Sequence, residues 1–205
     1  MMMNILHAKK YIIDLVNKEG LDFIDERGDK IKQLFKPVNV SFDNPIKVIN
    51  GLQILPDFDS YWKGVKLQDY CNQLITGKLG SFEYTYGNRF IEHFSVNQLD
   101  EIKNKLINNL NTRRAIAITF DPVIDNIKFE IPCLQLIQLT YNPGTNKVDL
   151  TCYFRSNDIS GAWYANMIGL GSLCVSLLYG TGLEAGKIHY VGMNAHIREE
   201  DFNNV

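Results

Sequence analysis

Cys133 is the residue of this 205-residue chain that is best placed to act as a nucleophile. It follows Pro132 at the edge of an expected strand, directly after a loop. A nucleophilic cysteine needs access and a nearby positive charge that favours the thiolate. The sequence predicts a hairpin that returns Arg155 to its side. The other cysteines fall on faces typical of structural thiols: Cys71, Cys152 and Cys174.

Two arginine-containing segments are candidates for binding an anion. Arg113 and Arg114 are adjacent at a helix-to-strand junction, and Arg155–Asp158, with the sequence RSND, lies between a strand and an apolar helix. Guanidinium groups match phosphate oxygens, and the Ser156 hydroxyl adds a donor. The alternatives stay open: the arginine pair is a solvated surface, and members of the RSND segment cap the helix that follows.

Composition limits the function classes. The net charge of −2 gives no basic surface for nucleic acid or for an anionic membrane, so a bound anion must be held by a local arginine cluster. The cysteines form no C-x-x-C pair and no zinc-finger spacing, so no metal site is expected. The N-terminal sequence lacks a signal peptide, which predicts a cytoplasmic location. The uncharged run 159–180 is expected to be a buried helix, not a membrane span.

These candidates must be positioned by a mixed set of elements in one domain, residues 1–205. Hydrophobic periodicity predicts helices at 4–19, 66–77, 97–111 and 159–179. Alternation and turn residues predict strands at 38–42, 115–120, 134–141, 148–154 and 187–191. We expect a turn at 25–28, an irregular segment at 45–65 and a polar, aromatic loop at 84–89. Helices and strands do not alternate strictly, which indicates an α+β or mixed α/β class.

The order and spacing of the candidate residues resemble the thymidylate synthase family. Cys133 lies twenty residues after Arg113, Asn166 eight residues after Asp158, and His196 thirty residues after Asn166. The segment 149–170, DLTCYFRSNDISGAWYANMIGL, is similar to the short archaeal branch of that family. The resemblance implies a thymidylate synthase-like α+β fold, in which a large mixed β-sheet packs against helices with one long buried helix.

The resemblance also implies roles around a nucleotide phosphate. Cys133 would attack C6 of the pyrimidine, and Arg155 would hold the phosphate and lower the thiol pKa. Ser156 would add a hydrogen bond to the phosphate. Arg113 and Arg114 would reach the phosphate in the partner subunit's site, which implies a homodimer. A monomer is the alternative.

Further roles follow for the base, the sugar and the cosubstrate. Asn166 would accept from N3–H of the base and donate to O4, which favours dUMP over dCMP. His196 would bond the sugar 3′-hydroxyl, and Tyr86 would line the site. Arg27 is a further phosphate candidate. Asp158 would contact a reduced pterin one-carbon donor, either methylenetetrahydrofolate or a tetrahydromethanopterin analogue.

The expected activity is therefore synthesis of dTMP from dUMP by a methyltransferase. Four departures from the family pattern accompany it. Leu134 follows Cys133 where histidine is usual, and Phe154 precedes Arg155 where glutamine is usual. Arg198 stands where a sugar-binding tyrosine is expected, and the chain ends nine residues after His196. Two alternatives remain open. Arg198 fits a pyrimidine nucleotide hydroxymethylase of the same superfamily, and the short C-terminus fits a non-catalytic nucleotide-binding protein.

Overall fold

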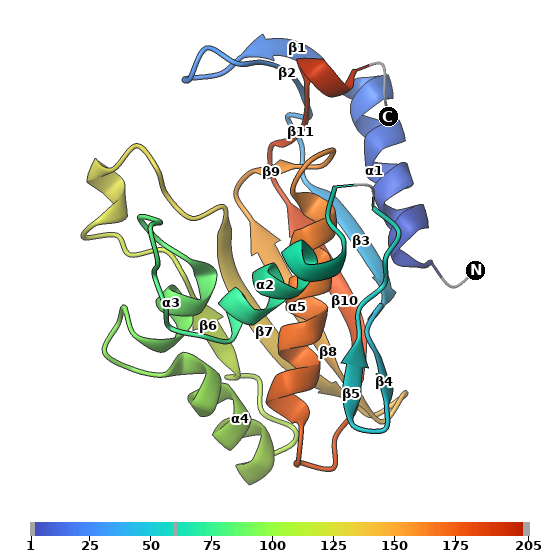
Figure 1. Ribbon diagram of the computed structural model, residues 1–205, viewed down its shortest axis with the longest axis vertical. Helices are drawn as coiled ribbons and strands as arrows, with labels where there is room; N and C mark the ends of the chain where they lie inside the picture. The colour runs from blue at the N-terminus through green and yellow to red at the C-terminus, as the bar shows by residue number, and fades with distance from the viewer. Residues whose placement is uncertain (1–2, 60, 203–205) are drawn as a thin grey trace.

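The computed structural model describes residues 3–59 and 61–202, and a mixed five-stranded sheet forms its centre (Figure 1). Residues 1–2, 60 and 203–205 of the predicted domain lie outside this part. Strands β8 and β10 are parallel, and the other neighbours are antiparallel. The order across the sheet is β3 (Val38–Asp43), β10 (Ala185–Gly192), β8 (Lys147–Phe154), β7 (Leu134–Asn142) and β6 (Ile116–Ile118).

Helices cover one face of this sheet (Figure 1). Helix α5 (Trp163–Leu178) is buried over most of its length, as its nearly uniform apolar sequence predicts. Helix α2 (Gly64–Leu74) crosses α5, and α1 (Ile5–Glu19) packs an apolar stripe beside β3. The predicted α+β fold with one long buried helix is confirmed, although α5 begins at Trp163 and not at residue 159. Among the described residues, no helix has the length and apolar character to cross a membrane.

A second, smaller sheet lies at one end of the large one (Figure 1). Its order is β1 (Leu21–Ile24), β2 (Lys30–Gln33), β11 (Ala195–Arg198) and β9 (Asn157–Asp158). The turn expected at 25–28 joins β1 to β2, and Gly28 adopts φ +85° there. The flanking strands were not predicted, because every residue of β1 is exposed and no alternation marks it.

Two segments differ from the sequence prediction. Residues 45–65 were expected to be irregular, but β4 (Lys47–Ile49) and β5 (Leu52–Ile54) form a hairpin there. Asn50 and Gly51 make its turn with φ of 50° and 78°, which is the conformation that two-residue hairpin loops prefer. The prediction of a loop at 84–89 was wrong from Tyr86 onward. Helix α3 (Tyr86–Ile91) begins there, because the Thr85 hydroxyl accepts from the backbone N–H of Asn88.

Helices α3 and α4 (Gln98–Asn108) lie beside β6 at the edge of the large sheet (Figure 1). Two single 3₁₀ turns, Asp125–Ile127 and Glu199–Asp201, complete the described elements. The long segment between β6 and β7 contains the first of these turns and leads directly into Cys133. A buried ion pair fixes it, because Arg89 Nη2 lies 2.7 Å from Asp125 Oδ1.

Candidate active site

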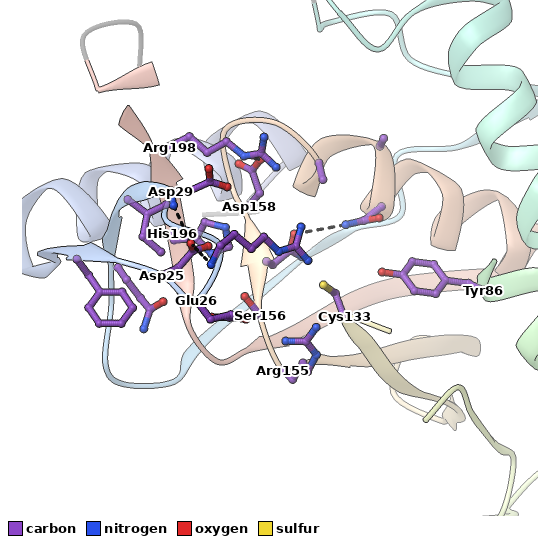
Figure 2. A pocket seen from close by; sticks show the side chains of 18 of the residues that line it. Asp25, Glu26, Asp29, Tyr86, Cys133, Arg155, Ser156, Asp158, His196 and Arg198 are labelled. Carbon is purple, nitrogen blue, oxygen red and sulfur yellow. Dashed lines mark hydrogen bonds and ion pairs between the residues drawn. The ribbon is translucent and has the colours of Figure 1, made fainter. Parts of the chain in front are cut away.

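A cavity of about 300 Å³ opens where the two sheets meet the first half of α5. Figure 2 shows its lining, with Cys133, Arg155 and Tyr86 on one side and the small sheet on the other. All the site residues expected from the sequence contribute to it except Arg113 and Arg114. The contributors are Arg27, Tyr86, Cys133, Arg155, Ser156, Asp158, Asn166 and His196.

Arg155 holds the backbone that carries Cys133. Its backbone N–H donates to the Cys133 carbonyl at 2.9 Å, as the β7–β8 hairpin requires. Its guanidinium donates from Nε to Pro132 O at 3.1 Å and from Nη2 to Ile131 O at 2.9 Å. The predicted return of Arg155 to Cys133 is therefore present. Donors on Nη1 and Nη2 remain for an anion, because a guanidinium carries five N–H groups.

Opposing effects act on the Cys133 thiol. Partial burial raises its pKa, whereas the charges of Arg155 and Arg27 lower it. The carboxylates of Glu130 and Asp158 raise it further, and the net shift is upward. Arg155 thus acts in the expected direction but does not outweigh burial, so the thiol form of Cys133 predominates at neutral pH.

The other three cysteines are buried in the core and lie away from the cavity. Burial raises the pKa of Cys71 to about 11 and that of Cys174 to about 12, and it raises the pKa of Cys152 as well. A buried thiol with a raised pKa is a poor nucleophile. Cys133 is therefore the reactive candidate among the cysteines.

Asn166 projects from α5 into the cavity and is only 6% exposed. Its Oδ1 accepts a 2.5 Å hydrogen bond from the Tyr70 hydroxyl of α2, and its Nδ2 donates to Asn157 Oδ1 at 3.4 Å. Sequence reasoning missed Tyr70. No local signal identifies it, because its partner is far away along the chain and the two helices must pack before they meet.

Strands β9 and β11 place His196 and Asp158 side by side as register partners. His196 Nδ1 lies 3.0 Å from the Asn194 carbonyl, which can only accept, so Nδ1 carries the proton and Nε2 can accept from a hydroxyl. Asp158 Oδ1 accepts from the Gly161 N–H at 2.8 Å and thereby stabilises the turn before α5. Its Oδ2 lies 2.9 Å from Nε of Arg198.

Arg27 approaches the cavity from the turn between β1 and β2. Asp25 Oδ1 accepts from the backbone N–H groups of Arg27 and Asp29, each at 2.9 Å, which fixes the turn. The Arg27 guanidinium forms a 2.8 Å ion pair with Glu130, and both side chains are 43% exposed. The charge of Arg27 is thus held at the mouth of the cavity.

Arg113 and Arg114 lie outside this cavity, exposed at the start of β6. Neither guanidinium forms a hydrogen bond or an ion pair with residues 3–59 or 61–202; the Arg113 contact is made by its carbonyl, which accepts from Gln138. Within the same described residues, no group of three or more His, Cys, Asp or Glu side chains is placed to hold a metal ion.

The family model of thymidylate synthase matches residues 2–205. The chain belongs to the thymidylate synthase family. Among curated proteins, it is 34% identical over 201 residues to the "Putative thymidylate synthase" of Methanothermobacter thermautotrophicus, which covers 94% of this chain and 90% of that protein. A protein of the same name from Methanococcoides burtonii is 35% identical, with 94% and 86% covered. The thymidylate synthase family comprises methyltransferases of nucleotide biosynthesis that use a folate-type one-carbon donor.

Proposed function

We propose that this thymidylate synthase family member methylates C5 of dUMP to form dTMP, and that the Cys133 thiolate initiates the reaction by adding to C6. The observation that carries the proposal is one cavity that is lined by the Cys133 thiol, by Arg155, which binds the backbone next to that thiol, by the buried amide of Asn166 and by the imidazole of His196. We propose that the chain acts as a single domain in the cytoplasm.

The phosphate would bind at the Arg155 end of the cavity. The free Nη hydrogens of Arg155 and the hydroxyl of Ser156 supply donors there, and Arg27 adds positive charge at the mouth. Arg155 would then have two roles, because the guanidinium that binds the phosphate also fixes the backbone of residues 131–132 beside the nucleophile. His196 Nε2 would accept from the sugar 3′-hydroxyl.

The base would lie between Cys133 and Asn166. Addition of the thiolate at C6 moves negative charge onto O4, and the Asn166 N–H group can stabilise that charge. The Tyr86 hydroxyl accepts from the Leu134 N–H at 3.3 Å, so its own proton is free to point into the cavity near Cys133. Burial raises the pKa of Tyr86, which keeps this group a donor at neutral pH. Elimination of Cys133 from C6 would regenerate the free thiol.

The described residues fit a flat pterin cosubstrate beside the base. The Trp62 and Tyr70 rings, 5.4 Å apart, line the cavity. The Trp62 indole is held by a 2.7 Å hydrogen bond to Gly161 O.

Asp158 Oδ1 accepts from the Gly161 N–H and the Ser160 hydroxyl. Among the described residues, Asp158 Oδ2 contacts only Arg198, so it retains a lone pair for a ring N–H of the pterin. The reduced pterin would supply both the one-carbon unit and the hydride that reduces it to a methyl group, and C5 would lose its proton before Cys133 leaves C6. Either methylenetetrahydrofolate or a tetrahydromethanopterin analogue would meet these contacts.

A covalent trap tests the nucleophile. The protein incubated with 5-fluoro-dUMP and a panel of reduced pterins should gain, on the peptide that contains Cys133, the mass of one nucleotide together with the one-carbon unit and its pterin, because the C5 fluorine blocks their release. Cys133→Ala should abolish the adduct and the release of tritium from [5-³H]dUMP while dUMP binding remains, because the phosphate contacts lie elsewhere. Cys174→Ala serves as the control and should retain both. An adduct that persists in Cys133→Ala would refute the proposal, and a 5-hydroxymethyl product would indicate the hydroxymethylase.

We further propose a symmetric dimer in which Arg113 and Arg114 complete the partner's phosphate site. Their exposed position outside their own cavity supports this arrangement. So does β6, where Ile116 and Ile118 are each 42% exposed while Ala117 between them is buried. Mixing Arg114→Ala with Cys133→Ala should restore up to about a quarter of the activity, because random pairing gives one intact site in half of the dimers. A 23.5 kDa species in sedimentation, with no complementation, would refute the dimer.

A further inference from the structure

Four polar side chains form a row behind the base-reading end of the cavity, and we call this row the amide network. It begins at the Tyr70 hydroxyl, passes through the side-chain amides of Asn166 and Asn157, and ends at the Tyr190 hydroxyl. Asn157 and Tyr190 are buried, with exposed fractions of 2% and 1%.

The two ends of the amide network are unequal. Tyr70 completes a 2.5 Å hydrogen bond to Asn166 Oδ1. Asn157 Nδ2 and the Tyr190 hydroxyl are both buried, and neither has a hydrogen-bond partner of standard geometry among the described residues. Asn157 is still close enough to Tyr190 to lower the pKa of its phenol slightly, against a larger increase caused by burial. Only the Tyr70 end therefore anchors the row firmly.

An amide anchored in this way has a fixed orientation. Asn166 Oδ1 is the only acceptor for the Tyr70 proton among the described residues, so Oδ1 faces Tyr70 and Nδ2 faces Asn157 Oδ1. The second lone pair of Oδ1 and the second hydrogen of Nδ2 then remain for a ligand. This pair complements uracil, which offers N3–H and accepts at O4, and it mismatches cytosine, which accepts at N3 and donates from its amino group.

The opposite orientation would satisfy the Tyr190 end of the row but would leave the Tyr70 proton without an acceptor among the described residues. If Tyr190 donated to Asn157 Oδ1, then Asn157 Nδ2 would donate to Asn166 Oδ1, and Asn166 Nδ2 would point at the Tyr70 oxygen. The amide would then present its atoms in the order that suits cytosine. The two tyrosines at opposite ends of the row thus favour opposite orientations of the two side-chain amides. Tyr70 forms a hydrogen bond and Tyr190 forms none of standard geometry in the described part of the chain, so the orientation that Tyr70 favours is adopted.

Packing keeps Tyr70 in position. Gly169 of α5 lies beneath its ring, and a Cβ added there would come within 3.1 Å of Tyr70 Cε1. The Trp62 ring also packs against Tyr70, at a centroid distance of 5.4 Å. Burial raises the pKa of the Tyr70 phenol, so the hydroxyl keeps its proton across the physiological range.

We propose that Tyr70 is a specificity-determining, positioning residue that orients the Asn166 amide and so selects a 4-oxo over a 4-amino pyrimidine. The inference rests on the proposed function, because it assumes that the cavity binds a pyrimidine nucleotide against Asn166.

Calorimetric binding of dUMP and dCMP to the full chain tests this role through the ratio of their dissociation constants. Tyr70→Phe keeps the ring and removes the donor, and it should reduce the preference for dUMP by roughly tenfold, the factor expected when one buried hydrogen bond becomes mismatched. Tyr190→Phe removes the competing donor and should leave the preference unchanged or increase it. Tyr84→Phe is the matched control, because its hydroxyl contacts Ile131 O and not the amide network, and its ratio should equal that of the wild type.

If Tyr70 had only a structural role, Tyr70→Phe would weaken the binding of both nucleotides equally. An unchanged ratio of the two dissociation constants in Tyr70→Phe therefore overturns the inference. A fall in preference for Tyr190→Phe overturns it too. If Tyr70→Phe does not fold, Asn157→Leu cuts the connection between Tyr190 and Asn166 and leaves the Tyr70 hydrogen bond in place, so its preference for dUMP must stay the same or rise for the inference to stand. Wild-type protein that binds neither nucleotide would refute the proposed function itself, whereas equal affinity for the two would refute only the selection mechanism.

Discussion

Removing the cation from the buried pair Arg89–Asp125 should destabilise the protein strongly. The side chains are 3% and 0% exposed, and the guanidinium lies 2.7 Å from the carboxylate. The second oxygen of Asp125 accepts from the Asp121 N–H at 2.8 Å, so this carboxylate also fixes the segment that leads to Cys133. Arg89→Met leaves a buried carboxylate without a counter-ion, which costs about 3–5 kcal/mol. That is a large part of the roughly 5–15 kcal/mol that stabilises a typical domain.

Urea unfolding followed by circular dichroism at neutral pH measures this loss. The double variant Arg89→Met/Asp125→Leu should recover most of it, because the uncompensated charge is gone. Lys30→Met is the control: it removes an ion pair of 2.6 Å whose side chains are about half exposed, and it should leave the unfolding free energy within error. A loss below about 1 kcal/mol for Arg89→Met, or no recovery in the double variant, would refute the reasoning.

Three further predictions follow from other contacts. Arg27→Ala should raise the pKa of the Cys133 thiol, and Glu130→Gln should lower it. The pH profiles of Cys133 alkylation by iodoacetamide should therefore move in opposite directions in the two variants. Shifts in the same direction would contradict the opposing effects of these two charges. Gly87→Ala places a Cβ 2.0 Å from Gln73 O and 2.3 Å from Thr76 O, and thermal unfolding should show a loss of about 1–3 kcal/mol that Gly144→Ala does not share. Burial raises the pKa of Cys71 to about 11 and that of Cys174 to about 12, whereas an unfolded thiol has a pKa of about 8.5. The folded state therefore holds these protons more tightly, and its stability should fall as the pH rises above the unfolded pKa. The urea midpoint should be lower at pH 10 than at pH 7, and an equal midpoint at the two pH values would contradict this.

The sequence predicted best those parts of the site that local patterns determine. The alternation from Leu134 onward, the turn at 142–146 and the returning strand predict the β7–β8 hairpin, and a hairpin necessarily brings Arg155 back to Cys133. The apolar run of α5 predicts a buried helix, and that helix carries Asn166. Period and turn chemistry suffice for these elements because their partners are close along the chain.

The parts that the sequence did not predict depend on distant contacts or on weak local signals. Tyr70 meets Asn166 only after α2 packs on α5, and no periodicity reports a hydrogen bond between helices. Strand β1 has no buried residue, so it carries no alternation. The Asn50-Gly51 turn was a readable hairpin signal that the surrounding prolines and glycines obscured.

The position of β11 has a consequence for the order of folding. This strand separates β2 from β9 in the small sheet, and its residue His196 pairs with Gln33 near the other end of the chain. The β7–β8 hairpin and α5 can form from neighbouring residues, whereas the pairing of β2 with β11, like that of β3 with β10, must wait for a loop closure that spans most of the sequence. Refolding should therefore yield a collapsed intermediate in which the β7–β8 hairpin and α5 are formed and the pocket is open, and nucleotide binding should recover more slowly than secondary structure.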